Sequence, residues 1–164
     1  MRDAKYDLVV SAILENQNAM YRAAMSFTRD REAALDVVQN SVLRALEHYR
    51  GLKAEAAVRS WLFQIVFHEA MRHIGKNRME FPGETEALPE GVYQEKAFEE
   101  SGQEVYEAVM RLPEAFRIIV VLRYYEEFSL KEIAGITGLN LSTVKSRLYA
   151  AHRKLGAELK EAEE

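Results

Sequence analysis

Apolar residues recur every three or four positions through most of this 164-residue chain, which is the spacing of helices that bury one face. In residues 7–27 this pattern predicts one or two helices, with a break near residues 16–18. A further helix is expected over residues 30–49, where the first residue is an aspartate suited to an N-cap. Another is expected over residues 58–75, with Trp61 in the core because a single tryptophan at helical spacing is usually packed.

The helical pattern stops between residues 80 and 102. This stretch has prolines at 82 and 89, glycines at 83 and 91, and five glutamates before Phe98. Such a composition offers little apolar surface to bury, so it predicts a flexible acidic linker. We therefore predict an all-α protein of two small helical domains, residues 1–79 and 103–164, joined by a linker over residues 80–102.

The C-terminal part of the chain predicts two helices joined by a tight turn. Ser129 followed by Glu132 is a capping box at the start of a short helix. Gly138 is expected to end that helix because glycine adopts a positive φ at no steric cost. Asn140 is a favoured N-cap for the second helix, whose buried face is expected to hold Val144, Leu148, Ala151 and Leu155.

Polar and basic residues occupy the other side of this second helix. They are Ser142, Thr143, Lys145, Ser146, Tyr149 and Arg153, with Arg147 on the flank. A helix-turn-helix with such a face can place the first turns of its second helix in a DNA major groove. Taken alone, a solvated amphipathic helix is an equal alternative, but the caps and the turn agree with helix-turn-helix. A helix with Pro113 at its first position, running to about Glu127, is expected to support the pair.

The distribution of charge matters more than its total. The formal net charge is −4, yet residues 1–80 carry +2 and residues 112–155 carry +3, whereas residues 81–111 carry −6 and residues 156–164 carry −3. Two mildly basic blocks separated by an acidic segment fit phosphate contacts at two places. Offsets this small also fit an ordinary protein surface.

The chain has no cysteine, no apolar run of about 18 residues and no signal-peptide pattern at its start. Disulfides and cysteine-ligated zinc are therefore excluded. We expect a cytoplasmic protein with no membrane insertion of its own.

Two further polar faces are candidate binding surfaces. The first combines Asp36, Gln39, Asn40 and Arg44 on one side of the helix predicted over residues 30–49. The second is a stripe in which His68, Arg72 and Lys76 recur every four residues. The first could dock a partner and the second could follow a nucleic-acid backbone, although solvation alone explains both patterns.

The sequence offers no catalytic constellation. His68 and His73 are five residues apart, which separates the two imidazoles by about 140° around a helix and prevents them from sharing a zinc ion. Neither a phosphate-binding glycine loop nor a nucleophile elbow is present. We expect no enzymatic activity, no catalytic residue, no metal and no cofactor.

Taken together, the two halves resemble the extracytoplasmic-function (ECF) branch of the bacterial sigma-70 factors. The second half resembles region 4 of that family through Leu112-Pro113-Glu114, residues 122–126, residues 129–134 and residues 143–148. The first half resembles region 2 through Tyr21-Arg22, Asp30, residues 36–39, and Trp61-Leu62 with Ile65.

The resemblance implies a factor that joins core RNA polymerase, melts promoter DNA and performs no catalysis. It implies a polymerase-binding set of Asp36, Gln39, Asn40, Leu43 and Arg44. It implies contacts to the minus-ten DNA from Arg50, His68, Arg72 and Lys76. It assigns contacts to the minus-thirty-five DNA to Ser142, Thr143, Lys145, Ser146, Arg147, Tyr149 and Arg153. Members of the family are typically held inactive by an anti-sigma factor, so such a partner is also implied.

The chain departs from the commoner family pattern at Asn40, where an acid is usual, at His68, where asparagine is usual, and at Arg72, where aspartate is usual. The last two departures bear on the preferred minus-ten sequence. A LuxR-type helix-turn-helix regulator is the main alternative, because its reading segment also ends in a Thr-Val-Lys helix. An adaptor that does not bind DNA is a third reading.

Overall fold

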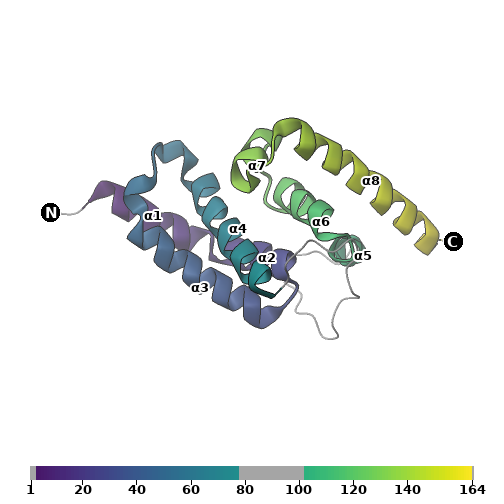
Figure 1. Ribbon diagram of the computed structural model, residues 1–164, viewed down its shortest axis with the longest axis horizontal. Helices are drawn as coiled ribbons and strands as arrows, with labels where there is room; N and C mark the ends of the chain where they lie inside the picture. The colour runs from purple at the N-terminus through teal and green to yellow at the C-terminus, as the bar shows by residue number, and fades with distance from the viewer. Residues whose placement is uncertain (1–2, 78–101, 164) are drawn as a thin grey trace.

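The structure is a computed structural model that describes residues 3–77 and 102–163, and this part of the chain is helical throughout (Figure 1). The N-terminal half consists of α1 (Ala4–Glu15), α2 (Gln17–Thr28), α3 (Arg31–Glu47), the 3-10 turns η1 (Tyr49–Gly51) and η2 (Glu55–Ala57), and α4 (Val58–Asn77). The C-terminal half consists of α5 (Gln103–Met110), α6 (Glu114–Val120), the π-helical turn η4 (Val121–Tyr125), α7 (Leu130–Thr137) and α8 (Leu141–Glu163). The predicted all-α class with two helical halves is confirmed, whereas nearly all of the expected linker lies outside the described residues.

The first two helices follow the predicted pattern with one difference at the start. α1 begins at Ala4 because the Asp3 carboxylate accepts the backbone N–H of Lys5 at 3.0 Å and that of Tyr6 at 3.4 Å. The expected break is confirmed at Asn16, whose side-chain amide donates to the carbonyl of Ala12 at 2.7 Å and so closes α1. α1 starts earlier than predicted because the Asp3 side chain caps it. The spacing of apolar residues gives no information on such a cap.

The core of the N-terminal half lies where α2, α3 and α4 pack against one another. Met20, Phe27, Leu62 and Phe63 are each at most 1% exposed. Trp61 is only half-buried and packs at the edge of this core, so its predicted place inside the core is only partly right.

The C-terminal half differs from the prediction in two places before its last helices. α5 was not predicted, because its eight residues hold too few repeats of the apolar pattern to stand out beside an acidic segment. Pro113 is the N-cap of α6, with ψ at 151°, rather than its first helical residue. The expected single helix to Glu127 ends as an α-helix at Val120 and continues as the π-helical turn η4.

The helix-turn-helix forms as predicted. In the capping box, Ser129 Oγ accepts the N–H of Glu132 at 3.0 Å, and the Glu132 carboxylate accepts the N–H of Ser129 at 2.9 Å. Gly138 ends α7 with a φ of +80°, a conformation that is strained for other residues. The side-chain amide oxygen of Asn140 then accepts the N–H of Thr143 at 2.8 Å and so caps the start of α8.

The two halves pack directly against each other. α7 lies along α4, and α6 lies beside α2 (Figure 1). The rings of Phe63 and Phe128 meet edge to face across this boundary with their centroids 5.1 Å apart. One set of buried apolar residues therefore continues from the first half into the second.

Candidate nucleic-acid and polymerase surfaces

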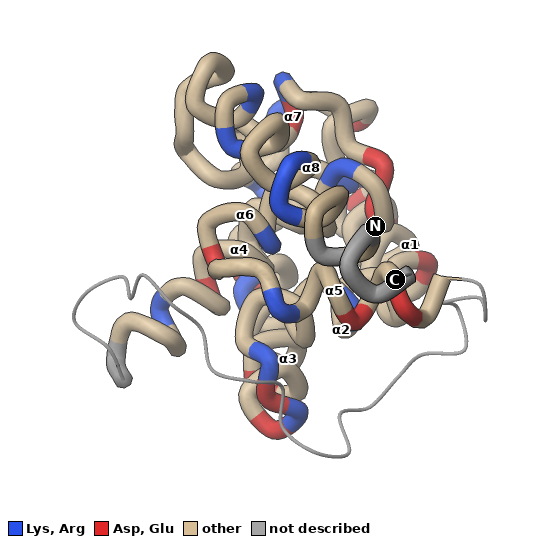
Figure 2. Tube along the Cα trace, turned by 90° about the vertical axis from the view of Figure 1, so that its right-hand side faces the viewer, with Lys and Arg blue, Asp and Glu red and all other residues tan. Residues whose placement is uncertain are grey.

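The reading face of α8 is open to solvent over its first turns. Val144, Leu148 and Ala151 are buried, as the sequence pattern predicts. The exposed residues of the predicted DNA set are Ser142, Lys145, Ser146, Tyr149 and Arg153, while Thr143 and Arg147 are half-buried. Figure 2 shows Lys and Arg segments along this helix. The exposed set combines cations, hydroxyls and an aromatic ring, which are groups that bind phosphates and base edges.

Arg147 has different surroundings from the rest of that set. It lines a cavity of about 340 Å³ between the two halves, together with Phe67 and Met71 of α4 and Glu114 and Ile118 of α6. The flank position predicted for Arg147 thus places it next to the N-terminal half.

The predicted polymerase-binding residues lie on one side of α3 but are not all equally free. Asp36, Gln39 and Asn40 are exposed, and Leu43 is 59% exposed. The Arg44 guanidinium instead forms an ion pair with Glu69 of α4, whose side chain is 5% exposed. Arg44 therefore connects α3 to α4, and an apolar leucine with polar neighbours remains on the outer surface.

The predicted minus-ten residues are spread over α4 and the turn before it. His68 and Arg72 are exposed, and Arg72 lies 3.7 Å from the same Glu69 carboxylate. Arg50 of η1 is exposed and stacks on the Tyr49 ring, 4.8 Å from its centroid. Lys76 belongs to the last turn of α4, but its side chain is outside the described part of the structure.

A hydrogen bond fixes the turn that carries Arg50. The Tyr49 hydroxyl donates to Asp3 at 2.7 Å. This hydrogen bond lowers the pKa of Asp3 below its usual value, with further contributions from the N–H groups of α1 and from Arg50. The same bond raises the pKa of Tyr49. The start of α1 thereby holds η1 in place.

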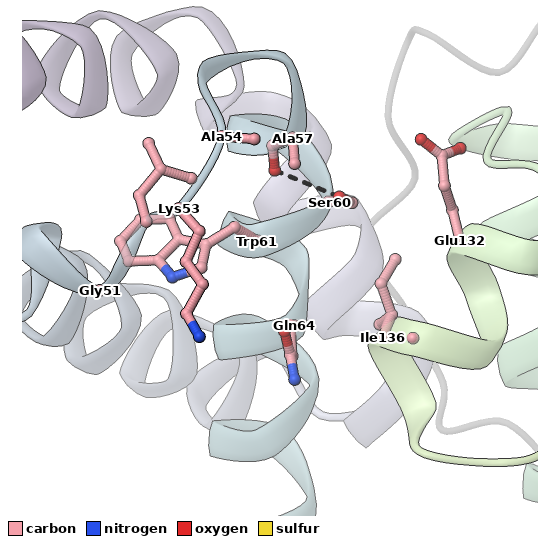
Figure 3. Close-up of a pocket in the computed structure, with 11 residues that line it drawn as sticks. Gly51, Lys53, Ala54, Ala57, Ser60, Trp61, Gln64, Glu132 and Ile136 are labelled. Atoms are coloured by element: carbon pink, nitrogen blue, oxygen red, sulfur yellow. Dashed lines mark hydrogen bonds between the residues drawn. The ribbon is translucent and has the colours of Figure 1, made fainter.

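A second cavity, of about 490 Å³, opens between the turn before α4 and α7 (Figure 3). Its first wall carries Lys53, Ser60, Trp61 and Gln64, and its other wall is formed by Glu132, Gly135 and Ile136 of α7. A cation, an amide and a half-exposed indole in a concave site can hold an unstacked base. Sequence analysis did not single out Lys53, Ser60 or Gln64, although Gln64 follows Trp61 at the helical spacing of three that places both on one face.

Comparisons with known proteins match both halves of the chain. Residues 12–79 match the family model for sigma-70 region 2, and residues 102–155 match that for sigma-70 region 4. The chain is 31% identical to the RNA polymerase sigma factor SigV of Bacillus subtilis over 152 residues, which cover 93% of this chain and 91% of that one. It is 28% identical to the ECF RNA polymerase sigma factor SigM of the same organism over 144 residues, covering 85% and 88% of the two chains.

Two solved structures share the fold. The first is the sigma factor RpoE in complex with the anti-sigma factor NepR from Bartonella quintana, with a TM-score of 0.72 and 24% identity over 90% of this chain and 94% of that one. The second is CnrH in complex with the cytosolic domain of CnrY, with a TM-score of 0.66 and 22% identity over 97% and 99%. Both likenesses extend over nearly the whole chain, so they include both halves.

Proposed function

This chain belongs to the extracytoplasmic-function branch of the sigma-70 family of RNA polymerase sigma factors, and from this premise we propose how its two halves divide the work of initiation. The chain is not an enzyme, because its family directs the polymerase to promoters and leaves the chemistry to the polymerase. A LuxR-type regulator is disfavoured because the first half matches region 2, and an adaptor without DNA binding is disfavoured because α8 keeps an exposed reading face.

In this proposal, residues 1–79 bind core RNA polymerase and the unwound minus-ten strand. The polymerase-binding set is Asp36, Gln39, Asn40, Leu43 and Arg44, with Leu43 as the apolar anchor. The minus-ten set is Arg50, His68, Arg72 and Lys76. We add Lys53, Trp61 and Gln64, because they line the same cavity, with Lys53 in the turn before α4 and the other two on α4 (Figure 3).

Residues 103–164 then read the minus-thirty-five element through α8. The contacting residues are Ser142, Thr143, Lys145, Ser146, Arg147, Tyr149 and Arg153. The single observation that carries this part of the proposal is the open polar face of α8 behind a correctly capped helix-turn-helix.

Regulation by an anti-sigma factor is part of the proposal. Among the solved structures that share this fold, RpoE is a sigma factor bound to the anti-sigma factor NepR. Among the described residues, no helix has both the length and the apolarity needed to cross a membrane. We propose that the chain acts in the cytoplasm and that any link to the membrane comes from the partner.

Run-off transcription tests the function directly. Purified bacterial core polymerase is supplied with a pool of templates whose upstream segments are randomised, with and without this protein. We expect specific transcripts only when the protein is present. Equal transcription in both reactions would contradict the proposal.

A further inference from the structure

Glu126 lies at the boundary between the two halves and is almost completely buried. The residue is 2% exposed, and it follows the turn η4 in the C-terminal half. Its carboxylate accepts two hydrogen bonds from Arg22 of α2, each 3.1 Å long, in the forked geometry of a bidentate pair. Arg59 of α4 reaches the same carboxylate at 3.3 Å and donates to the backbone carbonyl of Glu126 at 2.9 Å.

Aromatic rings enclose this ion pair. The Arg59 guanidinium lies over the Phe63 ring at 4.9 Å and over the Phe128 ring at 4.5 Å, so it is sandwiched between rings of the two halves. Burial raises the pKa of the Glu126 carboxyl, and the paired arginines offset part of that rise. A carboxylate taken out of water in this way is stable only while its cationic partners remain in place.

A second group of hydrogen bonds joins the halves at the other end of α2. Arg117 of α6 is 2% exposed and donates to the backbone carbonyls of Ser26 and Phe27. Arg29, just after α2, donates to the carbonyl of Met110 at 3.1 Å. Each of these arginines satisfies carbonyl groups near a helix end of the opposite half.

The packed arrangement covers part of the surfaces assigned to DNA. α7 forms one wall of the cavity that Lys53 and Trp61 line (Figure 3). Glu132 of α7 also lines this cavity, and its negative charge would repel a phosphate. Arg147 of the reading helix lies in the cavity against α4 and α6. Promoter DNA and the packed arrangement therefore compete for some of the same surface.

Distance leads to the same conclusion. The minus-ten and minus-thirty-five elements are separated by about 25 base pairs, or about 85 Å of B-form DNA. A compact chain of 164 residues has a radius of gyration of only about 15 Å. The packed molecule cannot reach both elements, so the two halves must separate before promoter DNA is bound.

We propose that Glu126, clamped by Arg22 and Arg59, is a latch that holds this sigma factor in a closed state in which the two halves cannot bind a promoter together. The inference rests on the proposed function for the two DNA surfaces. Opening exposes the Glu126 carboxylate and both guanidiniums to water, and polymerase or promoter DNA then selects the open state.

The test is Glu126→Gln, which keeps the shape of the side chain and removes its charge. The matched control is Glu69→Gln, because Glu69 is also a buried carboxylate held by two arginines but lies wholly within the N-terminal half. We expect small-angle X-ray scattering of the full chain to give a radius of gyration of about 15 Å for the wild type and for the control. The Glu126→Gln chain should give a larger radius, between about 15 Å and the value of about 20 Å for two bodies of about 11 Å each placed apart, because a tenfold shift opens only part of the population.

The labelling rate of a thiol introduced at the boundary between the two halves is a second measurement of opening. The chain has no cysteine, so Ile136→Cys, at a position that is 1% exposed, supplies a single reactive group beside α4. Its labelling rate should rise about tenfold when Glu126→Gln is added and stay unchanged when Glu69→Gln is added, because loss of one charge-assisted pair shifts the equilibrium by roughly that factor.

An unchanged radius and an unchanged labelling rate in a Glu126→Gln chain that keeps its helical circular dichroism would overturn the latch. If that variant loses its helical signal, Arg59→Gln decides by the same two measurements. Neither measurement uses polymerase or DNA, so a negative result counts against the latch alone. Absence of transcripts with every variant would count against the proposed function alone.

Discussion

Lys145 and Arg147 are close in sequence on α8 but differ in their surroundings. Lys145 is exposed on the open face, whereas Arg147 is half-buried beside α4 and α6. Residues two apart point about 200° away from each other around a helix, so these two side chains cannot both face the floor of one groove. Their contributions to DNA binding should therefore differ in kind.

We predict that Lys145→Ala costs about 1–3 kcal/mol of binding free energy and relaxes the preference at one or two minus-thirty-five positions. Arg147→Ala should weaken binding to all sequences alike and lower the salt slope by about one unit, because its place on the flank suits a backbone phosphate. Promoter-library selection with each variant, together with salt titrations, makes the comparison. A change of preferred bases with Arg147→Ala alone would reverse the assignment of the two residues.

The Asp3–Tyr49 bond gives a pH-dependent prediction. Because the pKa of Asp3 is lowered in the folded state, its stabilising contribution is present above the usual aspartate pKa and is lost as the pH falls through the lowered value. Tyr49→Phe removes the main cause of the shift, so the pKa of Asp3 should rise toward its usual value. NMR titration of the side-chain carboxyl measures this, and an Asp3 curve identical in both proteins would contradict the assignment.

Sequence reasoning placed polar residues on faces correctly but did not identify their partners. The spacing of Asp36, Asn40 and Arg44 gave one polar stripe, yet Arg44 turns to Glu69 on a different helix. Glu126 belongs to the segment 122–126 that resembles region 4, and its sequence position assigned it no partner. Periodicity within a helix carries no information on which distant residue meets a side chain, so ion pairs between helices could not be predicted.

At the level of elements, the turn between η4 and α7 is the strained point of the C-terminal half. Glu127 has a φ of +64°, in the left-handed region that costs a residue with a Cβ roughly 1–2 kcal/mol. This positive φ lies in the turn that leads from η4 to the Ser129 cap of α7.

We predict that Glu127→Gly stabilises the protein by about 0.5–1 kcal/mol, since relief of strain exceeds the added entropy of the unfolded chain. The midpoint of thermal unfolding should rise by about 2–4 °C per kcal/mol for a chain of this size. The comparison is Gly156→Ala in α8. Gly156 has open space around it and no positive φ, so this exchange between glycine and a residue with a Cβ involves no backbone strain. A lower midpoint for Glu127→Gly would mean that the Glu127 side chain makes a stabilising contact.

The outer face of α3 gives a second prediction at this scale. Asp36→Ala combined with Gln39→Ala should weaken binding to core polymerase by up to about tenfold, because each truncation removes a polar contact worth about 0.5–1.5 kcal/mol and 1.4 kcal/mol is tenfold in affinity. Stability should change by less than about 0.5 kcal/mol, since both side chains are exposed. The control is Glu15→Ala with Gln17→Ala, an exposed acid and amide on the first two helices. Equal affinities in a pull-down titration would show that this face of α3 is only solvated.

At the level of the whole molecule, the caps, the turn and the reading helix could be predicted because their signals are local. α5 could not, because it is short, and the packing of the two halves could not, because it depends on residues more than 100 positions apart, such as Arg22 and Glu126. The family resemblance predicted what each half does and left their arrangement open. The contact of Glu126 with Arg22 and Arg59, which joins the two halves, is the feature of that arrangement on which the proposed regulation depends.

The central claim is that one chain reads two separated promoter elements with its two halves. Sequencing the templates and the RNA 5′ ends from transcription on the randomised pool tests this claim most directly. We predict two enriched sequence blocks upstream of each start site, with centres about 25 base pairs apart, about 85 Å along B-form DNA. Lys145→Ala should weaken the sequence preference in the upstream block only. A single enriched block, or two blocks that both change with Lys145→Ala, would contradict the division of function between the two halves.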